Sequence, residues 1–208
     1  MGQSEEIQQL RVVNQRLTER VQELQLLMNL DPDTGLPTRR VFDRHVAEIL
    51  KNRDPTRGRG AGVGLLRLDE TYARIRNTRD RARALIFRTA ERIKSVVGDN
   101  VYQSDRFDEF LILFREVRDI DELVAVGRRV LNKVAHRHEP PAADISFSGL
   151  IGLSWCTDPR QCTRQGIDQA ELALKEAAWG DQRCVLYTER IGERHRRALN
   201  IDDRLGTS

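Results

Sequence analysis

Long hydrophobic runs are missing from this sequence of 208 residues. No segment approaches the roughly 20 apolar residues that a membrane-spanning helix requires. The first residues, Met-Gly-Gln-Ser-Glu-Glu, carry neither a basic nor an apolar stretch, so we expect no secretory signal. Hydrophobic residues make up 39% and charged residues 32%, which is typical of a soluble globular protein. These features predict a cytoplasmic protein without a membrane segment.

Cysteine is scarce, and none of the three residues forms a Cys-x-x-Cys pair; they are Cys156, Cys162 and Cys184. An odd number of unpaired cysteines is typical of free thiols in a reducing compartment. Thiolate zinc sites use paired ligands. We therefore expect neither a disulfide nor a metal site from these residues.

Aromatic residues are only 5% of the chain, and the charge is nearly balanced, with 35 basic and 32 acidic side chains. Nucleic-acid-binding surfaces need clustered cations and, for single strands, aromatic rings on which bases stack. In this sequence the arginines alternate with acids. We therefore expect no nucleic-acid partner.

A seven-residue repeat fills residues 4–30, and we define residues 1–30 as a dimerisation segment, a coiled-coil helix. Its apolar seam advances in steps of three and four residues, the spacing of a left-handed coiled coil. One Asn in the seam is typical of a parallel two-stranded coil, because an Asn pair across the axis fixes the register. The alternative is a single amphipathic helix docked on its own domain. The repeat predicts a homodimer through Ile7, Leu10, Asn14, Leu17, Val21, Leu24 and Met28.

Residues 31–190 alternate between helical and strand periodicity and predict one α+β domain, followed by a polar, initially helical tail over 191–208. We expect a central five-stranded mixed sheet flanked by helices. The glycine-rich stretch 57–62 is interpreted as a connector, and residues 104–109 as a hairpin turn. The expected helices span 38–51, 71–97, 120–138 and 167–178, and the expected strands span 63–68, 101–103, 110–114, 145–153 and 184–187.

Three motifs, in order along the chain, resemble those of GGDEF domains, the diguanylate cyclases. Residues 31–42 read DPDTGLPTRRVF, where the family has Asp-x-Leu-Thr-Gly-Leu-x-Asn-Arg-Arg-x-Phe. Residues 106–110 read Arg-Phe-Asp-Glu-Phe in place of Gly-Gly-Asp-Glu-Phe. Residues 170–177 read AELALKEA, similar to Ala-Asp-x-Ala-Leu-Tyr-x-Ala. The resemblance covers 31–190 and implies the family's palm-like nucleotidyl cyclase fold.

The resemblance also implies a chemistry, the formation of cyclic di-GMP from two GTP molecules. In that family each of two facing subunits holds one GTP. Two metal ions on carboxylates activate a ribose 3′-hydroxyl and neutralise the triphosphate. The glycines of the hairpin let the backbone approach the nucleotide closely.

The hairpin departs from the family pattern at both glycines, which are replaced by Arg106 and Phe107. The resemblance places guanosine where Phe107 adds a ring. Asp108 and Glu109 keep the acidic pair, with Phe110 after them, but without the glycines we interpret the two acids as ordinary turn residues.

The first metal-binding motif, Asp-x-Asp-x-Phe-Lys in the family, aligns in two registers. In the first, Arg67 replaces the leading Asp and Asp69 keeps the second. In the second, Asp69 takes the metal position and Asn77 the position of the family's guanine-reading Asn. A magnesium site, if one exists, would use Asp69, Asp108 and Glu109.

Other family residues are replaced as well. Ala84 stands where the resemblance places the Asp that reads guanine, and Ala178 where it places the phosphate-binding Lys. Asp181 replaces an Arg beside the triphosphate. Residues 97–101 contain no Arg, so the Arg-x-x-Asp motif of product inhibition is absent.

These losses predict a catalytically inactive GGDEF domain without catalytic residues or a cofactor, which acts as a dimeric signalling module and binds a protein partner. Each lost transition-state contact costs roughly 10²–10³ in rate. Two alternatives remain open. One is a sensor that binds GTP or cyclic di-GMP without turnover. The other is a divergent cyclase that uses the remaining acids and magnesium.

Overall fold

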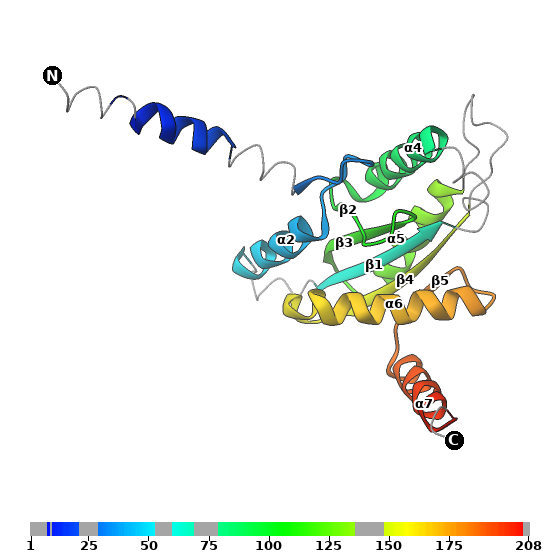
Figure 1. Ribbon diagram of the computed structural model, residues 1–208. Helices are drawn as coiled ribbons and strands as arrows, with labels where there is room; N and C mark the ends of the chain where they lie inside the picture. The colour runs from blue at the N-terminus through cyan, green and yellow to red at the C-terminus, as the bar shows by residue number, and fades with distance from the viewer. Residues whose placement is uncertain are drawn as a thin grey trace.

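The computed structural model describes residue 8 and residues 10–20, 29–52, 60–68, 79–135 and 148–205 (Figure 1). Residues 10–20 form an N-terminal helix that extends away from the domain. The order of elements agrees with the order expected from the sequence. The elements are α2 (Arg39–Asn52), β1 (Gly60–Leu68), α4 (Arg79–Val97), β2 (Val101–Gln103), β3 (Glu109–Val117), α5 (Ile120–Val134), β4 (Gly149–Cys156), the 3₁₀ helix η2 (Pro159–Cys162), α6 (Arg164–Trp179), β5 (Cys184–Leu186) and α7 (Glu189–Leu205).

The five strands form one mixed sheet in the order β2-β3-β1-β4-β5. All neighbours are antiparallel except β4 and β5, which run parallel. The antiparallel pairing of β2 with β3 confirms the predicted hairpin. The sheet therefore has the five strands and the mixed pairing that the sequence predicted.

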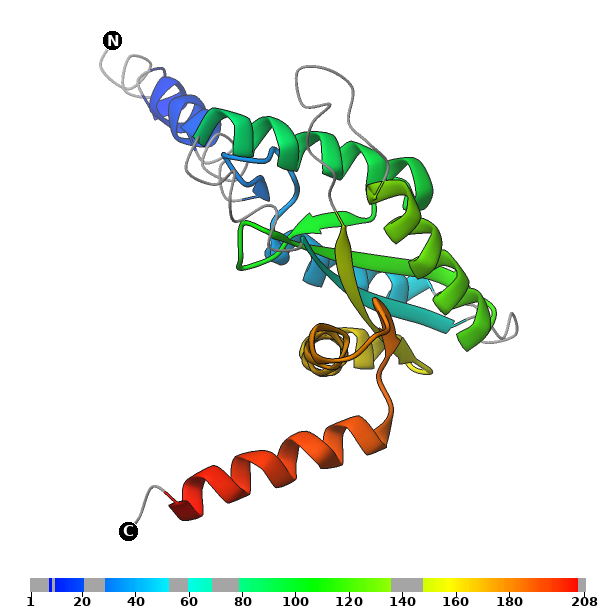
Figure 2. The ribbon, with the colours of Figure 1, turned by 90° about the vertical axis from the view of Figure 1, so that its right-hand side faces the viewer.

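Helices cover both faces of the sheet, because its central strands are apolar on both sides. On β1, Val63 and Leu65 face one core cluster, and Leu66 and Leu68 face the other. The first cluster also holds apolar residues of α2 and α6, and the second those of α4 and α5. Figure 2 shows α4 and α5 on one side of the sheet and α6 on the other. The domain thus has three layers.

Local capping fixes where several helices begin. Asp119 accepts a hydrogen bond from the Glu122 backbone N–H (2.7 Å) and caps α5, which starts one residue later. Asp158 and Gln161 form a reciprocal capping box at η2.

β4 and α6 approach so closely at Gly152 that a Cβ there would lie 2.0 Å from the Ala170 carbonyl oxygen.

The connector predicted over 57–62 is wrong at its C-terminal end, because β1 already begins at Gly60. The reason is tertiary packing. The Trp155 ring fills the space beside Gly60, and Leu123 fills the space beside Gly62. A stretch whose only side chain is the Ala61 methyl therefore lies buried in the sheet.

Several element boundaries also differ from the predicted ones. The helix predicted over 120–138 ends at Val134, and α6 begins at Arg164 instead of residue 167. β3 extends over Glu109–Val117, and β4 reaches Cys156. Residues 71–78 and 145–147, which we assigned to a helix and a strand, lie outside the described residues. Within the described part of the chain, no helix is long and apolar enough to cross a membrane.

A hydrogen-bonded turn joins the N-terminal segment to the domain. Asp31 accepts hydrogen bonds from the backbone N–H and the hydroxyl of Thr34, both at 2.8 Å. Arg83, on α4, donates to the Pro32 carbonyl at 2.9 Å. Arg44, on α2, donates to the Asn29 side chain at 3.1 Å. The turn is therefore bonded to two helices of the domain.

Candidate functional site

The turn between β2 and β3 is held by backbone and side-chain hydrogen bonds. The Glu109 N–H donates to the Arg106 carbonyl (3.1 Å), and the Gln103 amide donates to the same oxygen (2.8 Å). The Leu68 N–H donates to the Asp108 carbonyl at 3.0 Å, which ties the turn to the end of β1. These bonds fix the two residues that replace the family's glycines and the two acids that follow them.

Arg67 and Glu109 form the central pair of the site. They are cross-strand partners of β1 and β3, and the Arg67 Nε donates to Glu109 Oε1 at 2.7 Å. The Glu109 side chain is only 5% exposed. The interpretation of Glu109 as an ordinary turn residue is therefore wrong: it is the first residue of β3 and a buried carboxylate.

A second arginine contacts both acids of the signature. Arg106 Nε lies 3.2 Å from Asp108 Oδ1 and 3.1 Å from Glu109 Oε1. Asp108 lies in the turn, as expected. The hydrogen bond and charge of Asp108 raise the pKa of the Arg106 guanidinium above its usual value. Each acid of the signature is thus paired with an arginine.

Burial raises the pKa of Glu109 above the usual value for a glutamate, and the hydrogen bond and charge of Arg67 oppose this rise. Desolvation disfavours the charged carboxylate, whereas the neighbouring cation favours it. Arg67, and to a smaller extent Arg106, therefore favour the ionised form of Glu109 against the effect of burial.

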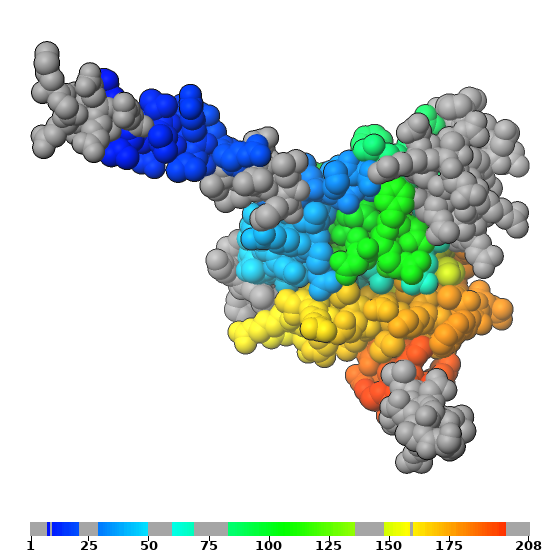
Figure 3. All heavy atoms as spheres, in the orientation of Figure 1, coloured from blue at the N-terminus to red at the C-terminus, as the bar shows by residue number. Residues whose placement is uncertain are grey.

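A pocket of about 400 Å³, which we call the hairpin pocket, opens beside this pair. Figure 3 shows the hairpin at the surface between α2 and α6, the two helices that complete the pocket. Lys175 on α6 lies 2.9 Å from Glu171, one helical turn earlier. The pocket is lined by Arg39, Leu65, Arg67, Ser104, Asp105, Arg106, Glu109, Leu111, Ile167, Glu171 and Lys175.

Most of the hairpin pocket was not predicted from the sequence, and its unpredicted members include three charged residues on helices, Arg39, Glu171 and Lys175. The spacing of Glu171 and Lys175 could have predicted that they lie together, because residues four apart on a helix share one face. Both also fall within the third family motif, where Lys175 stands at the family's Tyr. Nothing in the local pattern brings Arg39 to the hairpin.

The Phe107 ring is partly buried and packs against the core cluster between the sheet, α4 and α5. Its expected interference with guanosine stays a prediction. Ala84, Ala178 and Asp181 are exposed and do not line the hairpin pocket. Asp69 and Asn77, on which the second register depends, lie outside the described residues.

The described residues of this site do not fit a magnesium ion. Mg²⁺ is bound through free carboxylate oxygens and water, but Asp108 and Glu109 are both ion-paired with arginines. No group of three His, Cys, Asp or Glu able to hold a metal occurs among the described residues. The structure therefore offers no basis for a metal-assisted step at these two acids.

On the N-terminal helix, Leu10 and Leu17 of the predicted seam are 59% and 58% exposed. Asn14 lies between them and is also exposed. The other predicted seam residues, Ile7, Val21, Leu24 and Met28, lie outside the described residues. The described helix thus leaves apolar side chains uncovered, and the dimer stays a prediction.

Comparison with known proteins assigns the fold to one class. The sequence matches the family described as diguanylate cyclase, GGDEF domain, over residues 28–182. The chain belongs to the GGDEF family. No curated protein matches it.

Solved structures of this family have the same fold at low sequence identity. The coiled coil and GGDEF domain of DgcB from Caulobacter crescentus, in complex with c-di-GMP, is 15% identical with a TM-score of 0.68; the match covers 89% of this chain and 100% of that one. The diguanylate cyclase SiaD of Pseudomonas aeruginosa, in complex with its activator SiaC, is 19% identical with a TM-score of 0.62, covering 88% and 73%. The FimX GGDEF domain from Pseudomonas aeruginosa is 18% identical with a TM-score of 0.60, covering 76% and 98%.

Proposed function

We propose that this protein is a catalytically inactive GGDEF domain that acts as a dimeric, cytoplasmic signalling module and binds a protein partner. The observation that carries the proposal is the Arg67–Glu109 pair. A guanidinium stands on β1 where the first register places a metal-binding carboxylate. It also neutralises the second acid of the signature.

The electrostatics of this pair disfavour a bound metal ion. A divalent cation beside a fixed guanidinium is repelled, and the repulsion is strongest where water is excluded. Glu109 is 4% exposed, so solvent screens this region weakly. The triphosphate would also lack support, because Ala178 and Asp181 stand where the resemblance places two cations.

We expect the purified protein to make no cyclic di-GMP from GTP with Mg²⁺ or Mn²⁺, measured by chromatography of the products. Arg106→Gly together with Phe107→Gly should not restore activity, because Arg67 and the missing phosphate contacts remain. These losses act on one site and do not add as free energies. Product from the unmodified protein that disappears in Asp108→Ala would identify a divergent cyclase and overturn the proposal.

Four cations line the hairpin pocket beside three acids, and these cations favour a second candidate, a sensor that binds GTP or cyclic di-GMP without turnover. Arg39, Arg67, Arg106 and Lys175 all line it. Calorimetric titration with GTP plus Mg²⁺ and with cyclic di-GMP distinguishes the two functions. Binding heat that is seen with the unmodified protein and lost in Lys175→Met supports the sensor. Titrations of the unmodified protein that show no binding heat support the protein-interaction module.

The exposed leucines of the N-terminal helix support assembly through a coiled coil. Light scattering of the full chain at micromolar concentration should give twice 24.0 kDa. Leu10→Asp with Leu17→Asp should give the monomer mass, because two charges in the seam oppose pairing. Val12→Asp with Val13→Asp, which lie on the same helix outside the seam, is the matched control and should stay dimeric. A monomer from the unmodified chain would contradict the prediction.

Binding of a protein partner is the part of the proposal that rests on the family. SiaD, which shares the fold, was solved in complex with its activator SiaC. Recovery of a partner from the source cells with the full chain as bait tests this part. Recovery of this partner should be lost when substitutions are made in the N-terminal helix or on the surface of the domain. The partner should still be recovered with Asp108→Ala.

A further inference from the structure

Two of the three cysteines lie side by side in the core, although their spacing in the sequence predicted no disulfide. Cys156 is the last residue of β4, and Cys162 is the last residue of η2. Both belong to the core cluster that the sheet forms with α2 and α6, and both are 0% exposed. Their side chains are hydrogen-bonded to each other. The fold thus brings the two thiols into contact, and we call them the β4–η2 dithiol.

The short link between β4 and η2 turns the chain back so that the two sulfur atoms meet. The Gln161 side chain accepts a hydrogen bond from the Asp158 backbone N–H at 3.3 Å, which closes the turn. A Cβ on Gly166 would lie 2.6 Å from the Gln161 carbonyl oxygen and 3.3 Å from Cys156 Sγ. The Cys156 sulfur therefore faces the junction of η2 with α6, where Cys162 lies.

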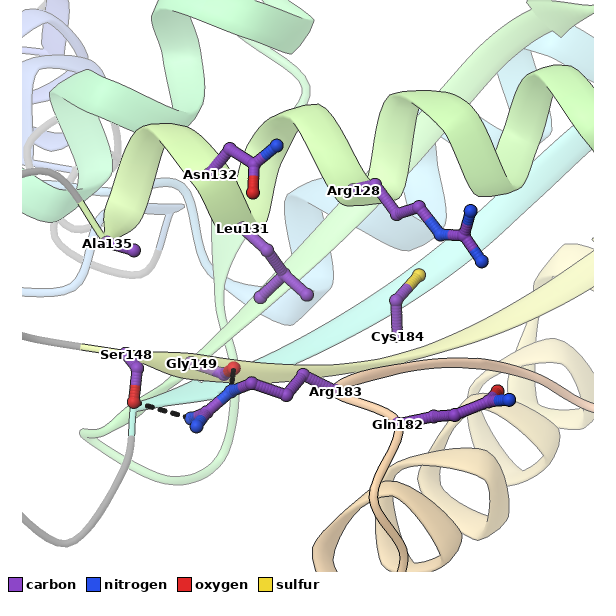
Figure 4. Close-up of a pocket in the computed structure, with 9 residues that line it drawn as sticks. All are labelled: Arg128, Leu131, Asn132, Ala135, Ser148, Gly149, Gln182, Arg183 and Cys184. Atoms are coloured by element: carbon purple, nitrogen blue, oxygen red, sulfur yellow. Dashed lines mark hydrogen bonds between the residues drawn. The ribbon is translucent and has the colours of Figure 1, made fainter.

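The third cysteine lies on the opposite face of the sheet. Cys184 begins β5, and Figure 4 shows its thiol pointing toward α5. It packs against the core cluster between the sheet, α4 and α5, and it is partly exposed. The sheet therefore separates Cys184 from the β4–η2 dithiol, which makes Cys184 an internal control for the reactions of the pair.

The closed fold protects the β4–η2 dithiol from reagents. The hydrogen bond to Cys156 and burial raise the pKa of the Cys162 thiol above its usual value. Thiolates are the reactive form, whereas protonated thiols in the core are inert. Reaction with a dissolved reagent therefore requires η2 to open. Once one of the two sulfurs has reacted, the other lies next to it, so that its attack is intramolecular.

We propose that Cys156 and Cys162 form a reversible disulfide that fixes η2 to the end of β4 when the chain meets a disulfide oxidant such as oxidised glutathione. One protein thiolate first attacks a sulfur of the oxidant and displaces one glutathione thiolate. The other protein thiolate then attacks the mixed disulfide and displaces the second glutathione thiolate. The two protein thiols give up two electrons and two protons, and the protons end on the two glutathione thiols. Transient disulfides of this kind are typical of oxidant sensing inside cells.

The disulfide acts on one wall of the hairpin pocket. η2 contacts α2, α6, β1 and β4. Residues of α2 and α6 complete the lining of the hairpin pocket. A covalent link from η2 to β4 therefore holds this part of the wall on the sheet. The proposal does not depend on whether the hairpin pocket binds a nucleotide.

Incubation with oxidised glutathione, continued to constant composition, tests the proposal. In the full chain, a peptide map without reductant should show Cys156 joined to Cys162. In Cys184→Ala, which keeps only the dithiol, oxidation should remove both thiols without adding the mass of glutathione. Cys184→Ala combined with Cys162→Ala is the matched control. It cannot close the link, so it should keep its thiol or gain the mass of one glutathione.

The thermal midpoint gives a second measurement, which reports on the fold and not on the thiols. Oxidation should raise the midpoint of the full chain by about 5 °C, because the link restricts the unfolded chain. Dithiothreitol should reverse the shift, and Cys156→Ala should show none. An unreacted dithiol at constant composition, a mixed disulfide as the end product, a link that includes Cys184, or a link that leaves the midpoint unchanged would overturn the proposal.

Discussion

Replacement of Arg67 by Met should lower the free energy of unfolding by about 1.5–3 kcal/mol near neutral pH, because the buried Glu109 loses the shorter of its two arginine contacts and keeps only Arg106. Arg67 is 27% and Glu109 5% exposed at the side chain, so water compensates little for the lost contact. Methionine keeps much of the volume of the arginine stem. Urea unfolding monitored by circular dichroism measures the loss.

The loss in Arg67→Met should depend on pH, with a sign set by Glu109. The folded pKa of Glu109 is raised above its unfolded value. Its contribution to stability is therefore fully present below the unfolded pKa and is lost as pH rises through the folded pKa. Without Arg67 the folded pKa rises further, which widens this window. Arg67→Met should be destabilised much less near pH 4 than near pH 8.

Two controls make this prediction specific. Arg67→Met combined with Glu109→Gln removes the titrating carboxylate and should remove the added pH dependence. Arg118→Met breaks an exposed pair with Glu122 on the surface, where the arginine side chain is 73% exposed. Surface pairs contribute little to stability, so Arg118→Met should be close to the unmodified protein at both pH values. A loss in Arg67→Met that is equal at both pH values would contradict the assignment to Glu109.

Gly152→Ala should destabilise the fold by about 3 kcal/mol or more, at the upper end of the costs of overpacking. The added Cβ would lie 2.0 Å from the Ala170 oxygen and 2.3 Å from the Leu174 nitrogen. Both are backbone atoms of α6, so the clash is relieved only if the helix moves off the sheet. The midpoint of urea unfolding measures the effect.

Gly180→Ala is the matched control for Gly152→Ala. Gly180 is exposed at the end of α6, and a Cβ there would lie 3.3 Å from the Glu176 oxygen. Surface substitutions of this kind usually change stability by about 0.5 kcal/mol or less, and this tighter contact should add little. A Gly152→Ala protein as stable as Gly180→Ala would show that β4 and α6 separate without cost.

The sequence predicted the order of elements well, because strand alternation and helical periodicity are local properties. The hairpin was found from its acids and from the two short apolar runs around it. The strand at Gly60 was missed, because the Trp155 ring that fills the space beside it comes from another strand.

The pairing of Arg67 with Glu109 could not be predicted from local pattern. Their contact depends on the register of β1 against β3, which places residues 42 positions apart side by side. The motif alone suggested an acid in a turn. The burial of Glu109 follows from its place at the start of β3, an inner strand of the sheet, and from the residues of α2 and α6 that line the same pocket. Likewise, Arg39 reaches the hairpin pocket only because α2 packs beside the hairpin.

The Arg67–Glu109 contact also constrains how this chain can change by mutation. A single substitution of Arg67 toward a metal-binding acid would place two carboxylates together in a buried position and strongly destabilise the intermediate protein. If Glu109 is substituted first, water can solvate the charge of Arg67, because the Arg67 side chain is already 27% exposed. The two orders of substitution are therefore unequal, because an acid introduced first at position 67 gives a protein that folds poorly. The ion pair therefore opposes the gain of an acid at position 67 more strongly than it opposes the loss of the acid at position 109.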